Sequence, residues 1–480
     1  MLTKELISLN SPKLQYIGVS LKNPHHTVIP TGTTVVTGPN GAGKSVLGKI
    51  LEKGWNITTN DIKSPVDGLK VKYMEFNDIH SLAGFKVEYY QQRFESSMND
   101  DVPTVAELLG KNVESETWKM AEKRLNISDI LDKKVNFLSS GELRKLLITN
   151  MMFDLPQFLI LDNPFIGLDA ASRDTLNEEL KQISDRGISI MLLICDPNEI
   201  PDYTDTVIPI KDLTIGEAIH CGSTPMENIR QNVASLFDFA VNIDGIPTPA
   251  TKQQSESDDT RHAVFELNKC NVKYGTRVIL RDVCWTVKQG ECWALAGRNG
   301  SGKSTLLSLI YADNPQVYSN EVKIFGRRRG TGESIWDIKK RIGYVSPEMH
   351  LYFGGGANRL IDVVSGGLND TVGCFRQITP QQEQRGLRWL KLLHMEHLAQ
   401  QRFNVLSAGQ QRLALLARTF IKSPELLILD EPMHGLDIAR KKAVRAIINT
   451  YARRDHTTII YVTHHKSEVP ECISHTKTLP

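Results

Sequence analysis

Unbroken apolar runs recur along the chain, and several of them end in a carboxylate. Phe158–Leu161 precedes Asp162, and Leu426–Leu429 precedes Asp430. Runs that are apolar at every position are typical of strands in a parallel sheet that is covered on both faces. Segments with helical spacing alternate with such runs along the chain, and Trp118–Leu131, ahead of Phe158, is one of them. The alternation predicts an α/β core whose ligands bind at the carboxyl ends of the strands.

A glycine-rich loop follows an expected strand in each half of the chain. Thr33–Thr37 leads into Gly38–Ser45, Leu295–Ala296 leads into Gly297–Ser304, and both loops read Gly-x4-Gly-Lys-Ser. This is the P-loop pattern, in which backbone N–H groups and a helix N-terminus face phosphates, the lysine reaches the β- and γ-phosphates, and the serine binds Mg²⁺. The residues expected to hold nucleotide are Gly38, Asn40, Gly41, Gly43, Lys44 and Ser45 in the first half, and Gly297, Asn299, Gly300, Gly302, Lys303, Ser304 and Thr305 in the second.

The second half of the chain repeats the first at a nearly constant offset. The step from Ser139 to Ser407 is the same as the step from Asp162 to Asp430. The step from the first P-loop to the second is nine residues shorter. The second half therefore has nine more residues between its P-loop and Ser407 than the first half has between its P-loop and Ser139. We expect this difference as a longer excursion in the second half, near Val322–Ile338.

A polar, proline-containing stretch separates the two halves. Residues 245–262 contain almost no apolar side chains, which is typical of a linker. The chain is therefore expected to comprise a first domain at 1–244, a linker at 245–262 and a second domain at 263–480. In a chain of 480 residues, each of these domains is large enough to bury its own core.

Composition argues against several classes of protein. The net charge of +2 gives no general basic excess for nucleic acid, although a local basic patch remains open. Seven cysteines without a Cys-x-x-Cys pair favour free thiols in a reducing compartment and argue against an iron–sulfur module. No apolar run approaches the ~20 residues of a membrane-spanning helix. Because the N-terminus lacks a secretory apolar core, we expect a cytoplasmic protein, with a mitochondrial location as the alternative.

Five motifs occur in the same order in each half. The P-loop is followed by Leu-Ser-x-Gly-Glu/Gln, an apolar strand that ends in aspartate, Gly-Leu-Asp, and a polar residue at the end of a further strand. This set resembles the ATP-binding-cassette (ABC) ATPases over nearly the whole chain outside the linker and the termini. The resemblance implies an α/β fold of two tandem ABC nucleotide-binding domains, each a P-loop RecA-like core with a helical signature subdomain and a small antiparallel β subdomain. It also implies ATP and Mg²⁺ as ligands, and hydrolysis of ATP to ADP and phosphate.

The cassettes of this family pack head to tail, so each ATP lies between the P-loop of one cassette and the signature of the other. In the site of the second-half P-loop, the resemblance implies that Asp430 holds Mg²⁺ through water, Glu431 polarises the attacking water and His464 contacts the γ-phosphate. The catalytic residues implied for this site are Glu431, His464 and Lys303, the further metal ligand is Ser304, and the signature residues from the first half are Ser139 and Gly141.

The site of the first-half P-loop departs from the family pattern at two positions. Asn163 stands where the family keeps a catalytic glutamate and cannot act as a base, and Asp196 stands where it keeps a histidine. We therefore expect nucleotide binding with slow hydrolysis. The alternative is that other carboxylates compensate. The residues implied to bind here are Lys44, with Ser45 and Asp162 as metal ligands, and Ser407 and Gly409 of the opposite signature.

The glutamine that family cassettes carry after the P-loop is not assigned. The second half has no glutamine in Ile342–His350. In the first half the candidates are Gln91 and Gln92, or none if Met74–His80 aligns with Val345–His350.

Aromatic and basic residues suggest two further contacts. The adenine-stacking aromatic is implied at Tyr274, which lies ahead of the second P-loop, and Tyr16 is the candidate in the first half. Arg327–Arg329 fits a nucleic-acid contact. A solvated turn is the more common explanation of such a charge run.

The chain lacks the long charged linker of the ABC-F translation factors. Its first signature, Leu-Ser-Ser-Gly-Glu-Leu-Arg-Lys at 138–145, resembles the ModF or photorepair-like group of tandem cassettes. The favoured function is a soluble ATPase that binds two ATP, hydrolyses ATP mainly at the second-half site, and closes and opens to act on an unknown macromolecular partner. We expect a monomer with an intramolecular pair of cassettes. The alternatives are the motor subunit of a transporter with a separate permease chain, and a ribosome-associated ABC-F-like factor.

Overall fold

The computed structural model describes most of the chain as two compact units. The first contains the described residues up to Asp238 and the second those from Phe239 onward, except that Gly435–Ala439 group with the first. Ser139, Asn299, most of the expected helix at Trp118–Leu131 and most of the expected linker lie outside the described residues. The described residues are 4–53, 61–76, 103–109, 130–134, 138, 140–168, 170–222, 224–247, 262–275, 277–298, 300–347, 349, 353, 358–369, 378–465 and 468–479.

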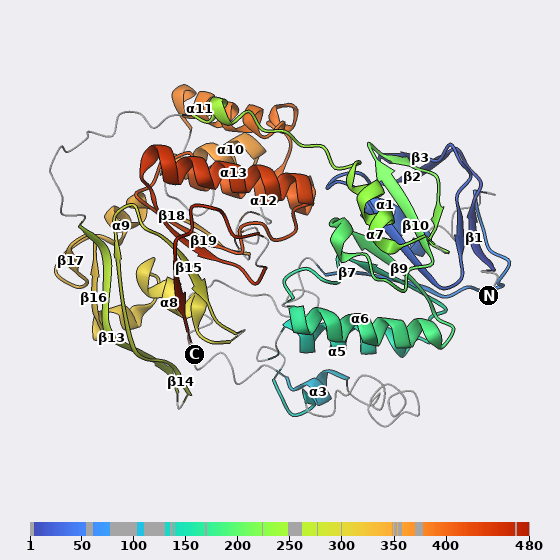
Figure 1. Ribbon diagram of the computed structural model, residues 1–480, viewed down its shortest axis with the longest axis horizontal. Helices are drawn as coiled ribbons and strands as arrows, with labels where there is room; N and C mark the ends of the chain where they lie inside the picture. Colours follow the sequence, from blue (N-terminus) through green and yellow to red (C-terminus); the bar gives the residue numbers. More distant parts are fainter. Residues whose placement is uncertain are drawn as a thin grey trace. The chain divides into compact units, whose positions relative to one another are not determined.

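Strands from distant parts of the chain form one main sheet in the first unit (Figure 1). The four strands at its β7 end are mutually parallel. A smaller sheet has the order β4 (Val28–Pro30), β1 (Glu5–Leu9) and β6 (Ile62–Lys63). The spatial order of the main sheet is β2 (Lys13–Tyr16), β3 (Val19–Lys22), β11 (Thr214–Ile215), β10 (Thr206–Lys211), β5 (Thr33–Thr37), β9 (Ser189–Ile194), β8 (Phe158–Asp162) and β7 (Val71–Glu75), with β12 (Ile219–His220) paired to β10.

Helices cover both faces of this sheet. Helices α5 (Ser140–Met152) and α6 (Ala170–Asp185) pack on one face and contact each other, and α1 (Lys44–Lys53) packs on the other. Successive residues of β8 alternate between two cores, so that Leu159 packs with the α5 and α6 side and Ile160 with the α1 side. The apolar run before Asp162 is thus confirmed as a parallel strand covered on both faces.

Two shorter helices complete the description of the first unit. They are α3 (Val105–Leu109) and α7 (Met226–Ala234). The hydroxyl of Thr104 accepts a hydrogen bond from the Glu107 backbone N–H at 3.2 Å, while the Glu107 carboxylate accepts one from the Thr104 N–H at 2.7 Å. This reciprocal pair is a capping box, which makes Thr104 the N-cap of α3.

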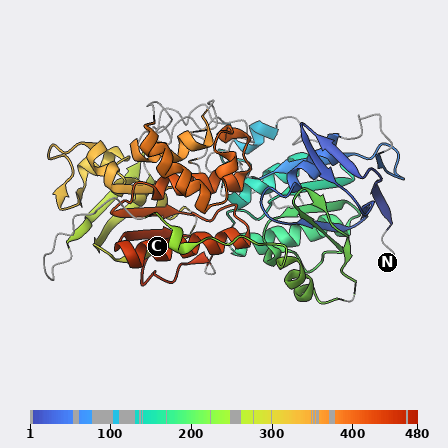
Figure 2. The same ribbon diagram turned by 90° about the horizontal axis from the view of Figure 1, so that it is seen from above.

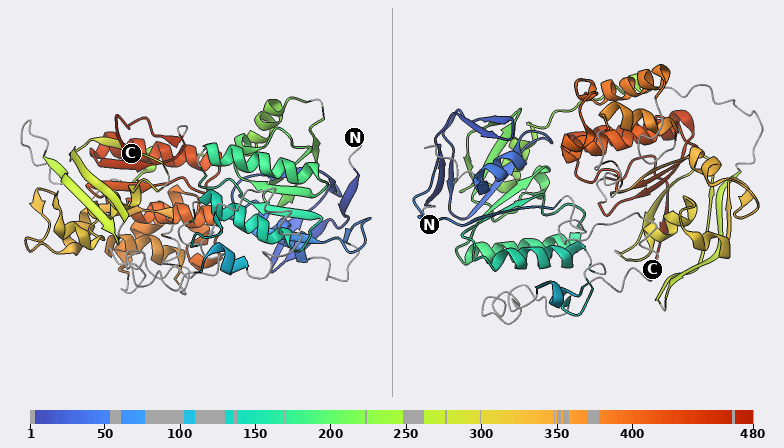
Figure 3. Two further views of the ribbon diagram at one scale, coloured as in Figure 1. Left: turned by 90° about the horizontal axis from the view of Figure 1, so that it is seen from below. Right: turned by 180° about the vertical axis from the view of Figure 1, so that it is seen from behind.

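The second unit contains two sheets. Its parallel sheet carries the P-loop, and its antiparallel sheet is built on the long β13–β14 hairpin, which Figure 3 shows in yellow-green. In spatial order, the parallel sheet is β18 (Ile342–Val345), β19 (Leu426–Asp430), β20 (Thr458–Val462), β15 (Cys292–Ala296) and β21 (His475–Thr478), and the antiparallel sheet is β14 (Arg277–Lys288), β13 (Ala263–Tyr274), β16 (Glu321–Ile324) and β17 (Arg327–Arg328).

A separate helical group packs beside the parallel sheet of the second unit. Helices α10 (Leu360–Ser365), α11 (Pro380–Leu392) and α12 (Ala408–Phe420) contact one another, and they appear in orange in Figure 2. The remaining helices are α8 (Lys303–Ile310), α9 (Ile335–Arg341) and α13 (Ile438–Asp455). A P-loop core, a helical subdomain that carries the signature and a small antiparallel subdomain are the parts that the sequence implied, and the expected fold class is confirmed.

Strand register refines the comparison of the two halves. Met74 pairs with Leu161, and Val345 pairs with Leu429. Because Leu161 and Leu429 each directly precede the strand-ending aspartate of their half, Met74 corresponds to Val345. The second half therefore has twelve more residues than the first between its P-loop and β18, and β16, β17 and α9 lie in this segment. Between β18 and the signature it has three fewer residues than the first half. This register supports the alignment of Met74–His80 with Val345–His350, in which neither half supplies the glutamine; Gln91 and Gln92 lie outside the described residues.

Candidate nucleotide-binding sites

The P-loop of the second unit joins the end of β15 to the start of α8. Gly297, Gly300 and Gly302 all have positive φ angles, and that of Gly302 is 92°. A Cβ atom on Gly302 would lie 2.8 Å from Cδ2 of Leu280. Glycine is required here both by the backbone conformation and by the close packing of the loop on β14. The chain thereby turns tightly enough to present its N–H groups at the N-terminus of α8.

Both P-loop lysines fold back over their own loops. The Lys303 Nζ donates hydrogen bonds to the carbonyls of Gly297 at 2.8 Å and Arg298 at 2.9 Å. The Lys44 Nζ donates to the carbonyls of Gly38 at 2.7 Å and Pro39 at 3.1 Å. Each ammonium is thus held at the rim of a loop whose N–H groups suit phosphate oxygens. The two units share this local geometry.

A carboxylate pair ends strand β19 in the second unit. Asp430 is its last residue, and Glu431 follows in a left-handed conformation with a φ of 49°. The Glu431 N–H donates to the Val462 carbonyl at 2.9 Å, which fixes this turn against β20. The Nε2 of His464, just beyond β20, lies 3.4 Å from Oε1 of Glu431. The structure therefore brings together two of the three expected catalytic side chains at the carboxyl ends of neighbouring strands.

Burial changes the acidity of Glu431. Its pKa is raised to about 8, first because burial removes water from the carboxylate and then because Asp430 and Glu468 are negatively charged, while Arg412 and Lys303 act in the opposite direction. A pKa near working pH suits a group that accepts a proton from water and later releases it. This value supports the expected role of Glu431.

Arg412 holds the backbone around these carboxylates. Its guanidinium donates to the carbonyls of Ser346 at 2.6 Å, Pro432 at 2.9 Å and Asp430 at 3.1 Å, and also to that of Glu431. Burial lowers the pKa of Arg412 to about 10. This value is still well above neutral pH, so the guanidinium stays charged. Arg144 occupies the same place in the first signature and donates to the Ile166 carbonyl. Neither arginine was singled out as a site residue, although its position in both signatures was a usable signal.

The first unit surrounds its fully buried Asp162 with polar side chains. The Tyr73 hydroxyl donates to Oδ2 of Asp162 at 2.8 Å, the Asn163 amide donates to Oδ1 at 3.0 Å, and the Ser45 hydroxyl also hydrogen-bonds the carboxylate. Burial and the nearby Glu75 raise the pKa of Asp162 to about 6, against the effect of the Ser45 and Tyr73 hydrogen bonds. A serine hydroxyl beside a carboxylate is the hard oxygen donor set that Mg²⁺ prefers, so these residues fit the expected metal.

Tyr73 and Glu75 were missed by sequence reasoning. They lie on β7, and Glu75 pairs directly with Asp162 across the strands. The Oε2 of Glu75 lies 3.4 Å from the Tyr73 hydroxyl and 3.2 Å from Nζ of Lys49. The usable signal was the repeat, because Tyr344 stands at the position of Tyr73 in the corresponding strand of the second half.

Asp196 has a structural role at the end of β9. Its Oδ1 accepts hydrogen bonds from the backbone N–H of Asn198 at 3.1 Å and from the Asn198 side chain at 3.0 Å. It thereby caps the short 3₁₀ helix Pro197–Glu199. The residue that replaces histidine therefore shapes its own loop.

The signature residues lie at helix starts. Ser407 caps α12 reciprocally with Gln410, and Gly409 lies in the first turn of that helix. Gly141 lies at the corresponding place in α5. Tyr274 ends β13, and its hydroxyl accepts a hydrogen bond from Asn314 at 2.9 Å, beyond the C-terminal end of α8. The adenine contacts expected at Tyr274 and Tyr16 remain predictions.

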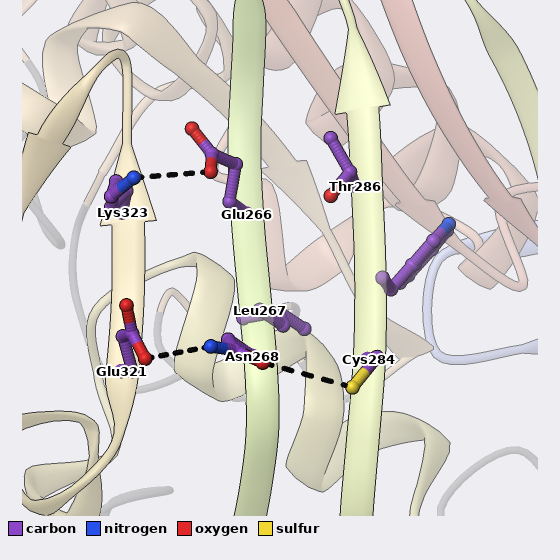
Figure 4. Close-up of a pocket in the computed structure, with 8 residues that line it drawn as sticks. Glu266, Leu267, Asn268, Cys284, Thr286, Glu321 and Lys323 are labelled. Atoms are coloured by element: carbon purple, nitrogen blue, oxygen red, sulfur yellow. Dashed lines mark hydrogen bonds and ion pairs between the residues drawn. The ribbon is translucent and has the colours of Figure 1, made fainter.

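A pocket of about 460 Å³ lies on the antiparallel sheet of the second unit (Figure 4). Its charged lining is paired, with Lys323 3.2 Å from Glu266 and the Asn268 amide donating to Glu321 at 2.7 Å. None of the expected nucleotide-binding residues lines this pocket. It carries no part of the phosphate-binding geometry.

Two sequence relatives match both halves of the chain. The chain is 33% identical over 465 residues to the ABC transporter ATP-binding protein ModF of Escherichia coli, covering 95% of this chain and 93% of that protein. It is 27% identical to an uncharacterized ABC transporter ATP-binding protein, C323.04, of Schizosaccharomyces pombe, covering 83% of this chain and 80% of that protein. Among the described residues, no helix is long and apolar enough to cross a membrane.

Solved structures agree on the fold. A model of ribosome-bound archaeal Pelota and ABCE1 matches 96% of this chain and 75% of that chain with a TM-score of 0.58 at 18% identity. The RNase-L inhibitor matches 92% of this chain and 82% of that chain with a TM-score of 0.51 at 18% identity. The family model described as ABC transporter matches residues 21–166 and 280–434, one segment in each half. The chain therefore belongs to the ATP-binding-cassette family of ATP-hydrolysing proteins, as a tandem pair of cassettes similar to ModF.

Proposed function

We propose that this chain binds two ATP and hydrolyses ATP mainly at the site of its second-half P-loop, and that it uses the resulting closing and opening of its cassettes to act on a macromolecular partner. The observation that carries the proposal is the contact of 3.4 Å between Nε2 of His464 and Oε1 of Glu431 at the strand ends beside the P-loop. At the corresponding positions the first unit has Asn163 and Asp196.

In the proposed reaction, Glu431 accepts the proton of the attacking water. Its left-handed backbone and the Arg412 hydrogen bonds to neighbouring carbonyls position the carboxylate. Lys303 neutralises the β- and γ-phosphates, and His464 donates to the γ-phosphate. Ser304 and Asp430 would hold Mg²⁺, which supplies charge neutralisation for the transferred phosphoryl group.

The proposed first-half site binds ATP but turns it over slowly. Asn163 donates its amide hydrogen to Asp162 and has no basic atom to offer water. Glu75 is the nearby carboxylate that could compensate, but it is engaged by Lys49. Ser45 and Asp162 would hold Mg²⁺ here, so binding is retained.

Each site is proposed to be completed by the signature of the opposite cassette. Ser139 and Gly141 would contact the nucleotide of the second-half P-loop, and Ser407 and Gly409 that of the first. The proposed domains are 1–244 and 263–480, joined by the linker 245–262. A polar linker of this length allows the halves to approach and separate within one molecule.

The lysines of the two P-loops offer a matched test. Lys303→Ala should abolish steady-state ATPase activity, whereas Lys44→Ala should lower nucleotide occupancy and leave appreciable hydrolysis. The two side chains make equivalent hydrogen bonds to their loops, so their structural cost should be similar. Equal loss of activity in both variants would show that the sites do not differ as proposed.

A second candidate function is the motor subunit of a transporter whose permease is a separate chain. It is favoured by the similarity to ModF, which is described as an ABC transporter ATP-binding protein. Fractionation of tagged protein, with and without Glu431→Gln, would distinguish the candidates. Recovery with membranes would support the transporter subunit, salt-sensitive sedimentation with ribosomes would support a ribosome-associated factor, and neither result would favour another macromolecular partner.

A further inference from the structure

A small polar network surrounds the loop that carries His464. Strand β20 ends at Val462, and the next three residues are Thr463, His464 and His465. The Thr463 hydroxyl accepts a hydrogen bond from the His465 N–H at 3.1 Å. This bond joins the residue before His464 to the residue after it, so the backbone is held on both sides of the histidine.

The Glu468 carboxylate connects this loop to the rest of the second unit. Its Oε2 accepts a hydrogen bond from the Thr463 hydroxyl at 3.1 Å, and its Oε1 lies 3.0 Å from Nζ of Lys441 on α13. The Glu468 N–H donates to the His465 carbonyl at 3.1 Å, and the Glu468 carbonyl accepts from the Tyr461 hydroxyl at 3.0 Å. The loop is therefore anchored to both β20 and α13.

Burial makes Glu468 a firm anchor. The residue is 7% exposed, and Tyr461 is fully buried. A buried carboxylate is stable only when it is paired and hydrogen-bonded, and each oxygen of Glu468 has a partner in Thr463 or Lys441. Hydrogen bonds to an ionised acceptor are roughly twice as strong as those between neutral groups. Glu468 can therefore hold the Thr463 hydroxyl in one orientation.

We propose that Glu468 is a positioning residue for His464 and acts through the Thr463 hydroxyl. The inference rests on the proposed role of His464 at the γ-phosphate. The Nε2 of His464 lies 3.4 Å from Oε1 of Glu431, and a donor accelerates the reaction only when it is held where charge develops in the transition state. Glu468 fixes the two residues that flank His464, and it thereby fixes the direction of the imidazole.

The first unit keeps only part of this network. Arg173 on α6 lies 3.6 Å from Glu199, which follows β9. The residue directly after β9 is Cys195, which has no hydroxyl, whereas Thr463 stands directly after β20. The loop that contains Cys195 and Glu199 also has no histidine. Its ion pair is therefore a control in which a similar contact can be removed without any histidine to position.

Thr463→Val tests the link between Glu468 and the loop without changing any charge. After subtraction of the hydrolysis that remains in Lys303→Ala protein, it should lower kcat roughly tenfold and change the KM for ATP by less than about two-fold. Thr463→Ser keeps the hydroxyl and should restore most of the activity. Glu468→Ala should lower kcat at least as much as Thr463→Val, whereas Glu199→Ala should change it by less than about two-fold.

A double-mutant cycle with His464→Ala separates positioning from general destabilisation. If Glu468 acts through His464, Thr463→Val should lower kcat by less than about two-fold once the imidazole is absent. The Thr463 variants carry the test if Glu468→Ala does not fold.

The possible outcomes of the cycle are distinct. Losses of kcat that multiply in the double variant would overturn the inference, because Thr463 would then act independently of His464. A loss in His464→Ala without one in folded Thr463→Val would overturn the inference alone. Unchanged kcat in His464→Ala would remove the proposed role of His464, and the inference with it.

Discussion

The hydroxyl of Tyr73 donates a hydrogen bond of 2.8 Å to Oδ2 of Asp162, the residue expected to hold Mg²⁺ at the first-half site. Asp162 is fully buried, and its pKa is raised to about 6 although this hydrogen bond stabilises the ionised form. The tyrosine therefore helps to keep this expected metal ligand ionised near neutral pH, where burial and Glu75 would otherwise favour its protonation.

Tyr73→Phe should weaken Mg-ATP binding at the first-half site. Without the hydroxyl, the pKa of Asp162 rises further, and a protonated carboxyl does not bind Mg²⁺. We expect a loss of affinity of roughly tenfold at about pH 6.5 that narrows toward about pH 8, because a hydrogen bond to a charged group contributes ~1.5–3 kcal/mol. Binding of a fluorescent ATP analogue would be measured in a Lys303→Ala background, which isolates this site.

Tyr344→Phe is the matched control for Tyr73→Phe. Tyr344 stands at the corresponding position of β18, and its ring stacks on Tyr311 in the second unit. It should leave binding at the first-half site unchanged. If Tyr73→Phe lowered the affinity for the ATP analogue equally at every pH, Tyr73 would not act through the ionisation of Asp162.

The pKa of Glu431 predicts a pH-dependent stability. In the folded state it is raised to about 8, whereas the unfolded value is 4.5. Between these values the unfolded chain has lost a proton that the folded chain retains, so stability falls as the pH rises through this window. Glu431→Gln has no such proton. The melting temperature of Glu431→Gln relative to that of the wild type should therefore increase as the pH rises from about 5 to about 8.

Scanning calorimetry across this pH range would measure the difference. Each pKa unit corresponds to ~1.4 kcal/mol, so a total gain of a few kcal/mol is expected. Glu471→Gln is the control, because the side chain of Glu471 is 74% exposed. A difference between Glu431→Gln and wild type that stays constant with pH would contradict the raised pKa.

The strands and P-loops were accessible from sequence because their signals are local. The run before Asp162 and the glycines at Gly38–Gly43 each specify a conformation through their own residue types. The sequence also identified the carboxylates that follow buried strands, since a parallel sheet places those strand ends together.

The surroundings of these carboxylates were not accessible in the same way. Tyr73 and Asp162 are distant in sequence and meet only because β7 and β8 are paired.

Asn163 provides a test of why the first-half site is expected to be slow. Its φ angle is 52° and that of Glu431 is 49°, and each N–H is bonded to the neighbouring parallel strand. Glutamate should therefore fit at position 163. We expect Asn163→Glu alone to raise single-turnover hydrolysis by less than about two-fold, because Asp196 is proposed to place a negative charge near the γ-phosphate. Asn163→Glu with Asp196→His should raise it by roughly tenfold or more.

Asp196→Asn with Asn163→Glu separates charge from hydrogen bonding. Asparagine keeps an oxygen that can accept from the Asn198 N–H, so the cap of the following turn is preserved. An intermediate rate would show that the charge of Asp196 matters by itself. Full activity of Asn163→Glu alone, measured with Lys303→Ala to silence the other site, would remove Asp196 from the explanation.

Arg412→Lys should destabilise the second unit and impair its hydrolysis. The guanidinium donates to four backbone carbonyls around Asp430 and Glu431, and a lysine ammonium has three hydrogens with a different geometry. At least one buried carbonyl loses its partner, and the cation that lowers the pKa of Glu431 is replaced by one that cannot occupy the same position. We expect a loss of roughly 3 kcal/mol in unfolding free energy and a shift of the pH–rate profile to higher pH.

Calorimetry and the pH dependence of hydrolysis would measure the two effects of Arg412→Lys. Arg453→Lys is the control, since the side chain of Arg453 is 70% exposed on α13 and should tolerate the change. A destabilised Arg412→Lys with an unshifted pH profile would mean that Arg412 serves only the backbone. A shifted profile would instead show that the same guanidinium both holds the loop after β19 and sets the acidity of Glu431, so that folding of this loop and proton transfer depend on one side chain.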